Sequence, residues 1–310
     1  ERNDAFYRQP PRLRYVLLRP FAGLPEGMYE AGLVDAAEVS LVGLERIRDP
    51  GNPLSQELSV YSQLSIHYVG LNARKAPFDD PDVRRAFAMA VDRDRLNDLL
   101  FQDSVTPARG FLPPGMPGYD PDLQGVPYDP AGAKALLQQK YPDLAQFPTV
   151  VFTTAGQGGG VGGVTGALIQ MWQEALGVQV RVRQVDPAAY FEELRRPEYA
   201  DDLFTYGWIA DYPDPENILD VLFHSRAANN AGGFGDAEVD RLLEEARTEP
   251  QVEARLALYR QAEARLVEQV AGIPLYHDRV YLLVKPWVRD LRVTAQGLYT
   301  LEQASLEGKE

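Results

Sequence analysis

A run of glycines in the middle of the chain has the spacing of a phosphate-binding turn. Gly158, Gly160 and Gly163 fit the pattern G-x-G-x-x-G, between a segment typical of a strand and a segment typical of a helix. Asp186 follows after about 20 residues, at the end of the next predicted strand, where an acidic residue would bind the ribose of a dinucleotide. Because glycine-rich turns satisfy several spacings by chance, a nucleotide-binding α/β enzyme is the weaker hypothesis.

The stretch from residue 206 to residue 215, YGWIADYPDP, leaves a predicted strand and enters a loop fixed by prolines. In an α/β sheet, ligand-binding groups follow the carboxyl ends of the strands. Trp208 offers a flat face there, and Asp211 offers a charge that binds a cation. Residue types alone equally allow Asp211 and Asp214 to be turn or cap residues and Trp208 to be a core residue.

Other side chains give little sign of catalysis or of a metal site. His67, His224 and His277 lie far apart, and none is followed three or four residues later by a histidine or a carboxylate. We expect hydrogen-bonded structural roles for all three. The chain has no cysteine, which excludes disulfides, thiol nucleophiles and iron–sulfur clusters.

Composition excludes further classes of function. With 310 residues, the chain is long enough for about two domains. Its 45 acidic residues exceed its 31 basic residues, and the net charge of −14 argues against nucleic acid or an anionic membrane as a partner. No apolar run approaches the roughly 20 residues of a membrane span, and the first residues lack the pattern of a signal peptide.

Strands and helices alternate along the chain. Strands are predicted at residues 13–18, 63–69, 149–154, 178–184 and 203–206. Helices are predicted near residues 27–32 and at 81–101, 130–137, 164–176, 190–194, 237–247 and 251–270. A proline-rich ordered loop fills residues 106–129, and a second long loop follows residue 206. The alternation over residues 149–206 predicts an α/β architecture with parallel strands.

Residues 71–93, LNARKAPFDDPDVRRAFAMAVDR, resemble a specific pattern of the family 5 extracytoplasmic solute-binding proteins. These are the dipeptide- and oligopeptide-binding components of ABC importers. The resemblance continues in family order through LPPG at 112–115, YDP at 128–130, residues 207–217, DRLLEEA at 240–246, IPLYH at 273–277 and KPWV at 285–288. It implies a lobe similar to type II periplasmic binding proteins, with a mixed sheet flanked by helices, and a partial remnant of the other lobe.

The resemblance implies that the chain is the C-terminal portion of a longer protein. Residues 1–68 would be a remnant of lobe one, residues 69–275 a complete ligand-binding lobe two, and residues 276–310 a segment that returns to lobe one. Hinges are expected near residues 68–70 and 274–277. We expect a monomeric, extracytoplasmic carrier, periplasmic or anchored as a lipoprotein, which delivers its ligand to the membrane subunits of an ABC importer. Neither a cofactor, nor a nucleic-acid partner, nor enzymatic activity is expected.

In peptide-binding members of the family, the aspartate of the Gly-Trp-x-x-Asp stretch pairs with the α-ammonium of the peptide, a role that the resemblance assigns to Asp211. Backbone groups of Trp208 and Ile209 would pair with the peptide main chain as an added strand. Some members bind the peptide carboxylate through an arginine where this chain has Thr205, and Arg196 is the predicted substitute. That departure keeps a non-peptide solute, such as an oligosaccharide or a metal chelate, as the alternative. Hinge closure over the ligand is the expected mechanism.

Overall fold

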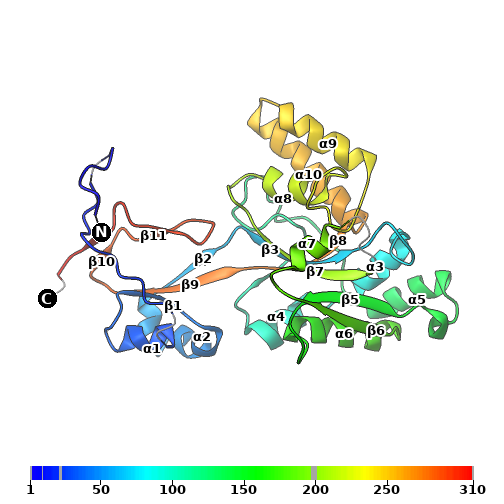
Figure 1. Ribbon diagram of the computed structural model, residues 1–310, viewed down its shortest axis with the longest axis horizontal. Helices are drawn as coiled ribbons and strands as arrows, with labels where there is room; N and C mark the ends of the chain where they lie inside the picture. Colours follow the sequence, from blue (N-terminus) through cyan, green and yellow to red (C-terminus); the bar gives the residue numbers. More distant parts are fainter. Residues whose placement is uncertain (1, 9, 21–22, 197–200, 309–310) are drawn as a thin grey trace. The chain divides into compact units, whose positions relative to one another are not determined.

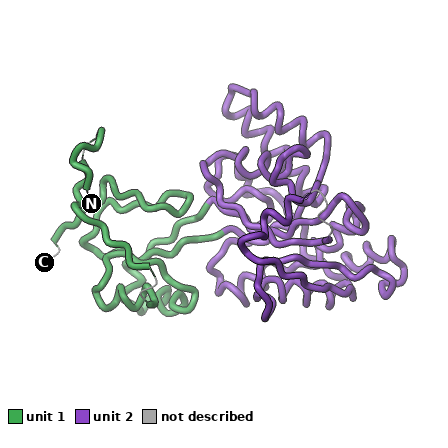
Figure 2. The backbone as a smooth tube through the Cα atoms, in the orientation of Figure 1, with its two compact units in different colours: residues 1–63, 278–310 green, residues 64–277 purple. Residues whose placement is uncertain are grey.

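The computed structural model describes residues 2–8, 10–20, 23–196 and 201–308. The chain divides into two compact units (Figure 2). Unit 1 comprises residues 1–63 and 278–310, and unit 2 comprises residues 64–277.

Unit 2 is built on a six-stranded mixed sheet with the strand order β4-β8-β3-β7-β5-β6. In chain order the strands are β3 (Ser65–Leu71), β4 (Thr106–Pro107), β5 (Val150–Ala155), β6 (Val180–Val185), β7 (Leu203–Ile209) and β8 (Gly272–His277). β5 runs parallel to both of its neighbours, β6 and β7, whereas β3 runs antiparallel to β7 and β8. The parallel pairing confirms the α/β prediction for residues 149–206.

Helices lie on both sides of this sheet. They are α3 (Pro81–Met89), α4 (Arg93–Phe101), α5 (Pro130–Lys140), α6 (Gly163–Leu176), α7 (Tyr190–Leu194), α8 (Glu216–Phe223), α9 (Ala237–Thr248) and α10 (Val252–Glu268). α4, α5 and α6 lie along one side, and α8, α9 and α10 gather on the other (Figure 1). Asp80 and Asp129 begin α3 and α5, because each side chain accepts a backbone N–H of the first turn and is followed by proline.

The core of unit 2 packs around fully buried aromatic rings. Phe78, Phe87, Phe152 and Trp172 belong to one cluster of side chains from the sheet, α3 and α6. The indole Nε1 of Trp172 donates a hydrogen bond of 3.0 Å to the carbonyl oxygen of Phe87. This bond satisfies the polar atom of a large buried side chain and fixes α6 against α3.

Unit 1 holds a smaller sheet with the order β1-β9-β2. Its elements are α1 (Pro25–Glu30), β1 (Ala36–Glu38), α2 (Leu41–Arg48), a 3-10 helix at Pro53–Glu57, β2 (Leu58–Ser62) and β9 (Arg279–Val284). Two short ladders follow, β10 (Val288–Arg289) with β13 (Ser305–Leu306) and β11 (Arg292–Val293) with β12 (Tyr299–Thr300). Its buried cluster consists of Tyr29, Ala37, Ile47 and Leu283.

Three predicted elements are wrong. Residues 13–18 form no strand: Arg14 O accepts the backbone N–H of Arg2 at 2.8 Å, but no ladder forms with a described strand, and Leu17 and Leu18 are exposed. The predicted helix at 81–101 is two helices, since Asp92 caps a new start by accepting the backbone N–H of Arg95. The loop predicted after residue 206 contains the end of β7 and all of α8. An apolar run needs a partner strand to become a strand, and a capping aspartate ends one helix where it begins the next.

Candidate functional site

Strand β7 has one edge that is only partly paired. It pairs with β3 over its whole length, from Leu203 to Ile209. Its pairing with β5 consists of two positions and ends where Phe204 faces Thr153. Beyond Phe204, no described strand residue pairs with this edge of β7, so the end of the strand offers free backbone groups.

The register identifies which backbone groups lie on the open edge. Just past the end of β7, Ala210 N donates to Leu64 O at 2.8 Å. Hydrogen-bonded and non-hydrogen-bonded pairs alternate in an antiparallel ladder, so the backbone of Trp208 faces β3, and those of Gly207 and Ile209 face the open edge. The prediction that the backbone of Trp208 faces the open edge is therefore wrong: Gly207 lies there, together with Ile209 as predicted. The side chain of Ile209 is exposed.

Tyr190, the first residue of α7, stands where β5 and β7 separate. Its hydroxyl lies 2.7 Å from Thr205 O and 3.2 Å from Thr153 O, within hydrogen-bonding distance of both carbonyls. The side chain is 4% exposed, and burial raises the pKa of its hydroxyl to about 12. The hydroxyl occupies the place of the next pairing between the two strands, and so marks the start of the open edge.

The two carboxylates of the following loop have different surroundings. Asp214 forms a bidentate ion pair with Arg255, at 2.7 and 2.8 Å, and accepts the backbone N–H of Glu216 at the start of α8. The carboxylate of Asp211 is exposed, and no residue that the structure describes binds it. Asp214 is therefore the cap and ion-pair residue, and Asp211 is the carboxylate available to a ligand.

Asn217 is a residue that sequence reasoning missed. It lies in the first turn of α8, and its Oδ1 accepts the indole N–H of Trp208 at 3.1 Å and the backbone N–H of Asp211 at 3.0 Å. The residue belongs to the stretch that resembles the solute-binding family, but its type alone gives no hint of these partners.

Gly207 lies close to a neighbouring ring. A Cβ atom at this position would lie 3.1 Å from Nδ1 of His67, which is directly opposite on β3. The His67 ring is held in place by stacking on Tyr276 with 4.5 Å between ring centroids. A side chain at position 207 would therefore push on this stacked pair, next to the open backbone groups of β7.

The arginine predicted for the peptide carboxylate is engaged elsewhere. Arg196 follows α7, is exposed, and pairs with Glu193 at 3.0 Å. Its neighbour Arg195 donates to the carbonyl of Phe191 and to Oδ1 of Asn229. Arg195 has no acidic partner in the described part of the chain. No described hydrogen bond or ion pair links either arginine to Asp211.

The glycine-rich turn connects β5 to α6, and β6 follows in parallel, so the context of a dinucleotide site exists. Two of its polar groups, however, are bound by residues of β6 and of the segment that follows it. Gly158 N donates to Gln184 Oε1 at 2.7 Å, and Asp186 accepts a bond of 2.9 Å from Gln157. A Cβ at Gly160 would meet only open space, so no close approach requires glycine there.

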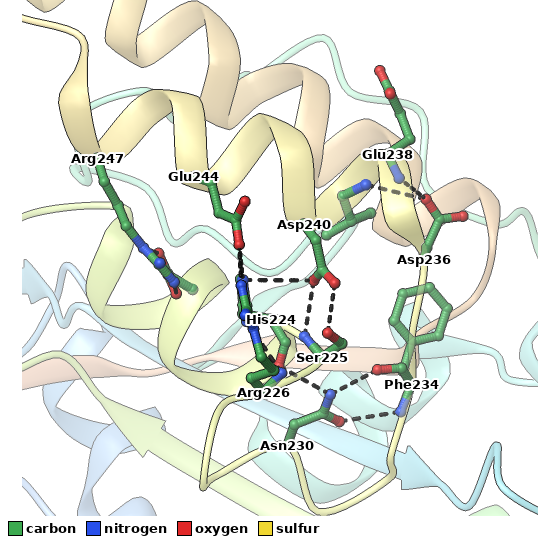
Figure 3. Close-up of polar contacts among 12 residues, drawn as sticks. His224, Ser225, Arg226, Asn230, Phe234, Asp236, Glu238, Asp240, Glu244 and Arg247 are labelled. Atoms are coloured by element: carbon green, nitrogen blue, oxygen red, sulfur yellow. Dashed lines mark hydrogen bonds and ion pairs between the residues drawn. The ribbon is translucent and has the colours of Figure 1, made fainter.

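Two of the three histidines have the hydrogen-bonded structural roles expected for them. His224 is buried at the end of α8, and its Nδ1 accepts the backbone N–H of Arg226 at 3.1 Å. The proton is therefore on Nε2, which donates to Glu244 of α9 at 3.2 Å, with Asp240 nearby (Figure 3). His277 is also buried, with Nδ1 2.7 Å from the backbone oxygen of Ser65.

A sequence model of the bacterial extracellular solute-binding proteins, family 5 (middle region), matches residues 1–230. The chain belongs to this family. Its relatives include the Di/tripeptide-binding protein 2 of Pseudomonas aeruginosa (strain UCBPP-PA14), 32% identical over 77% of this chain and 45% of that protein. The dipeptide-binding protein of Escherichia coli K12 is 26% identical over 79% and 46%. This family 5 chain thus spans less than half the length of these relatives.

Solved structures share the fold of the family 5 chain. HbpA2 from Haemophilus parasuis aligns with a TM-score of 0.81 and 22% identity, over 98% of this chain and 60% of that one. DppA from Helicobacter pylori, solved with the peptide STSA, aligns with a TM-score of 0.71 and 22% identity, over 93% and 56%. The predicted fold, similar to type II periplasmic binding proteins, is confirmed.

Two further features are absent from the described residues of this family 5 chain. Among the described residues, no helix combines the length and the apolar composition that crossing a membrane would take. The same residues gather no group of three or more histidine, cysteine, aspartate or glutamate side chains that would hold a metal ion.

Proposed function

We propose that this family 5 chain captures peptides, binding the α-ammonium of the peptide at Asp211 and the peptide main chain along the open edge of β7. One observation carries the proposal: an exposed carboxylate without a described partner lies two residues beyond a strand edge whose backbone groups are free. Relatives named di/tripeptide-binding and dipeptide-binding protein support the choice of ligand.

The chemistry of the two contacts is complementary. An ammonium group donates charge-assisted hydrogen bonds to a carboxylate, which are stronger than bonds between neutral groups. Gly207 and Ile209 present N–H and C=O groups to a peptide that adds itself as a strand, which gives affinity independent of the peptide sequence. Side chains of the peptide then contribute through hydrated contacts.

The peptide carboxylate needs a cation. Arg196 was assigned to this role, and release from Glu193 would have to precede its binding to a ligand. Arg195 has no acidic partner to give up in the described part of the chain, and its charge lies close enough to Tyr206 to lower the pKa of that hydroxyl, although burial raises it more. We therefore infer that Arg195 competes with Arg196 for this role.

In the full-length gene product, the proposed activity is that of a carrier. Closure of two lobes over the ligand requires contacts made to both lobes in the closed state only. The closed carrier would deliver its peptide to the membrane subunits of an ABC importer, outside the cytoplasm, as a monomer and without chemical change to the ligand. The family description, extracellular solute-binding proteins, supports this assignment.

A non-peptide solute is the second candidate. The relative named heme-binding protein A of Haemophilus influenzae is 29% identical over 79% of this chain and 45% of that protein. The two candidates differ in whether an amino terminus is recognised. Mass spectrometry of the ligand that copurifies with the full-length gene product separates them directly.

The test is calorimetry with Ala-Ala-Ala and N-acetyl-Ala-Ala-Ala on the full-length gene product. Asp211→Asn is expected to weaken binding of the free-amine peptide by about 2–5 kcal/mol, because the ammonium loses its charged partner. Affinity for the acetylated peptide should not change. Equal affinity of the variant and the wild type for the free amine, or no binding of alanine peptides by the wild type, would overturn the proposal.

A further inference from the structure

One buried side chain links the end of β7 to Asp211, the residue that binds the ammonium group in the proposed site. Asn217 is 3% exposed and lies in the first turn of α8. Its single Oδ1 atom accepts both the indole N–H of Trp208, at 3.1 Å, and the backbone N–H of Asp211, at 3.0 Å. The indole at the end of β7 and the peptide plane before Asp211 therefore share one acceptor.

The backbone of Asn217 is also held in place. The backbone N–H of Asn217 donates to the carbonyl of Asp214 at 3.1 Å. Asp214 is clamped by Arg255 of α10 through two bonds of 2.7 and 2.8 Å. A bidentate pair of this kind restricts both side chains in distance and orientation. Asn217 is therefore a fixed point from which the turn after β7 is held.

The side chain of Asp211 lacks an anchor of its own. Its carboxylate is exposed and has no partner among the described residues, so the direction in which it points is set by its backbone. The bond from Asn217 to the N–H of Asp211 is the side-chain contact that fixes this backbone plane. A ligand group that is already oriented costs less entropy when it binds than one that must first be ordered.

We propose that Asn217 is the positioning residue of the ammonium site: it orients the carboxylate of Asp211 and the indole of Trp208 without touching the peptide. This rests on the proposed function, in which Asp211 binds the amino terminus. The chemistry explains the residue type. A carboxamide oxygen has two lone pairs for two N–H donors, and it adds no second negative charge beside the ammonium.

The two partners determine which end of the carboxamide faces Asp211. The indole N–H of Trp208 and the backbone N–H of Asp211 are both donors, so the atom that faces them is the carboxamide oxygen. A flipped amide would direct N–H groups at both donors, so the oxygen stays turned toward Asp211.

The experiment uses the full-length gene product and the same two peptides, Ala-Ala-Ala and N-acetyl-Ala-Ala-Ala. Asn217→Leu keeps the size of the side chain and removes the acceptor. We expect affinity for the free amine to fall about tenfold, since two hydrogen bonds of ordinary strength are lost, and affinity for the acetylated peptide to change less than about twofold. Asn217→Asp keeps both acceptor contacts and should restore affinity to within about threefold of the wild type.

Coupling to Asp211 separates positioning from a general structural role. The double variant Asp211→Asn with Asn217→Leu should bind no more weakly than Asp211→Asn alone, because a residue that acts only through Asp211 has nothing left to orient. Asn97→Leu serves as the matched control. Asn97 is a buried asparagine of α4 whose Oδ1 also accepts a backbone N–H, that of Val105. It should lower the melting temperature and leave the ratio of the two affinities unchanged.

Each outcome decides one question. If Asp211→Asn leaves binding of the free amine intact, the proposed function fails and the positioning role fails with it. If Asp211→Asn weakens binding, but Asn217→Leu weakens both peptides equally or adds fully to Asp211→Asn, the positioning role alone is overturned. Should Asn217→Leu fail to fold, Asn217→Ser, whose shorter hydroxyl does not reach both donors, carries the same comparison.

Discussion

Two turns follow neighbouring strands of the same sheet, and they differ in whether their polar groups have hydrogen-bond partners. After β5, the side chain of Gln184 binds the backbone of Gly158, and Gln157 binds Asp186. After β7, the carboxylate of Asp211 has no described partner. The first turn has the spacing of a nucleotide site, but the amide of Gly158 and the carboxylate of Asp186 are bound by glutamine side chains. The second has no established catalytic motif and leaves a charge for a ligand.

Neighbouring strands explain the difference. Gln184 lies on β6, directly opposite Thr154 in the parallel ladder, and therefore beside the turn that follows β5. On the open side of β7, the ladder with β5 stops at Phe204. The turn after β7 is instead held by Asn217, which binds a backbone amide and leaves the carboxylate free. The turn that has the motif spacing therefore has bound polar groups, and the turn of the proposed site has an unbound carboxylate.

The largest expected effect contrasts the two aspartates of these turns. In the full-length gene product, Asp211→Asn should weaken peptide binding by about 2–5 kcal/mol, because a charged partner of the ammonium is removed. Asp186→Asn is the matched control and should leave the affinity within about 0.5 kcal/mol, as Asp186 only serves its own turn. Isothermal titration measures both. A large effect of Asp186→Asn would show that the turn after β5 also takes part in binding.

A third turn, within residues 106–129, differs from both because a buried carboxylate accepts hydrogen bonds from its backbone amides. Glu263 of α10 is 2% exposed and accepts the backbone N–H groups of Phe111 and Leu112, each at 2.7 Å. Burial raises the pKa of Glu263 from 4.5 to about 7. Between these values the folded state keeps a proton that the unfolded state releases, so the free energy of unfolding falls as pH rises from about 4.5 to 7.

Glu263→Gln should remove this loss, since the amide keeps an oxygen for both N–H donors and does not titrate. The variant is expected to match the wild type near pH 5 and to exceed its free energy of unfolding by on the order of 3 kcal/mol at pH 8. Urea denaturation across this range measures the difference. Glu253→Gln, at an exposed position of the same helix, should change little. Parallel pH profiles for Glu263→Gln and the wild type would contradict the assignment.

Local signals in the sequence were sufficient for much of the fold. Asp80 and Asp129, each followed by proline, predict two helix starts that the structure has. Asp92 has the same capping chemistry, but no proline follows it, and the apolar spacing alone predicts one helix through this position. Residues 13–18 show the limit of an apolar run, which predicts a strand whether or not a partner strand exists.

The site depends on contacts that no local pattern contains. Residue types left Asp211 and Asp214 equivalent, and the difference between them comes from Arg255, 41 residues beyond Asp214. The family resemblance singled out Asp211, but not the register that turns the backbone of Gly207 rather than Trp208 to the open edge. Both distinctions depend on contacts between residues far apart in the sequence, which local patterns do not reveal.

Tyr190 tests how the open edge begins. Tyr190→Phe removes the hydroxyl that lies against the carbonyls of Thr153 and Thr205, and leaves buried acceptors without their donor. The free energy of unfolding should fall by about 1–3 kcal/mol. Tyr128→Phe, at an exposed position, is the control and should change it by less than about 0.5 kcal/mol. Equal small effects would mean that the hydroxyl does not hold the strands where they separate.

The smallest effect is expected when the turn after β5 loses its hydrogen bonds with the Gln184 side chain of β6. Gln184→Ala removes the acceptor for Gly158 and the donor to Gly160, both of which are exposed and are then solvated by water. Stability should fall by less than about 1 kcal/mol, because exposed groups exchange one partner for another. Amide exchange at Gly158 should accelerate, with peptide affinity unchanged. If the freed amide of Gly158 instead bound NADH, seen as a change in NADH fluorescence, the glycine spacing would be a nucleotide site that Gln184 masks.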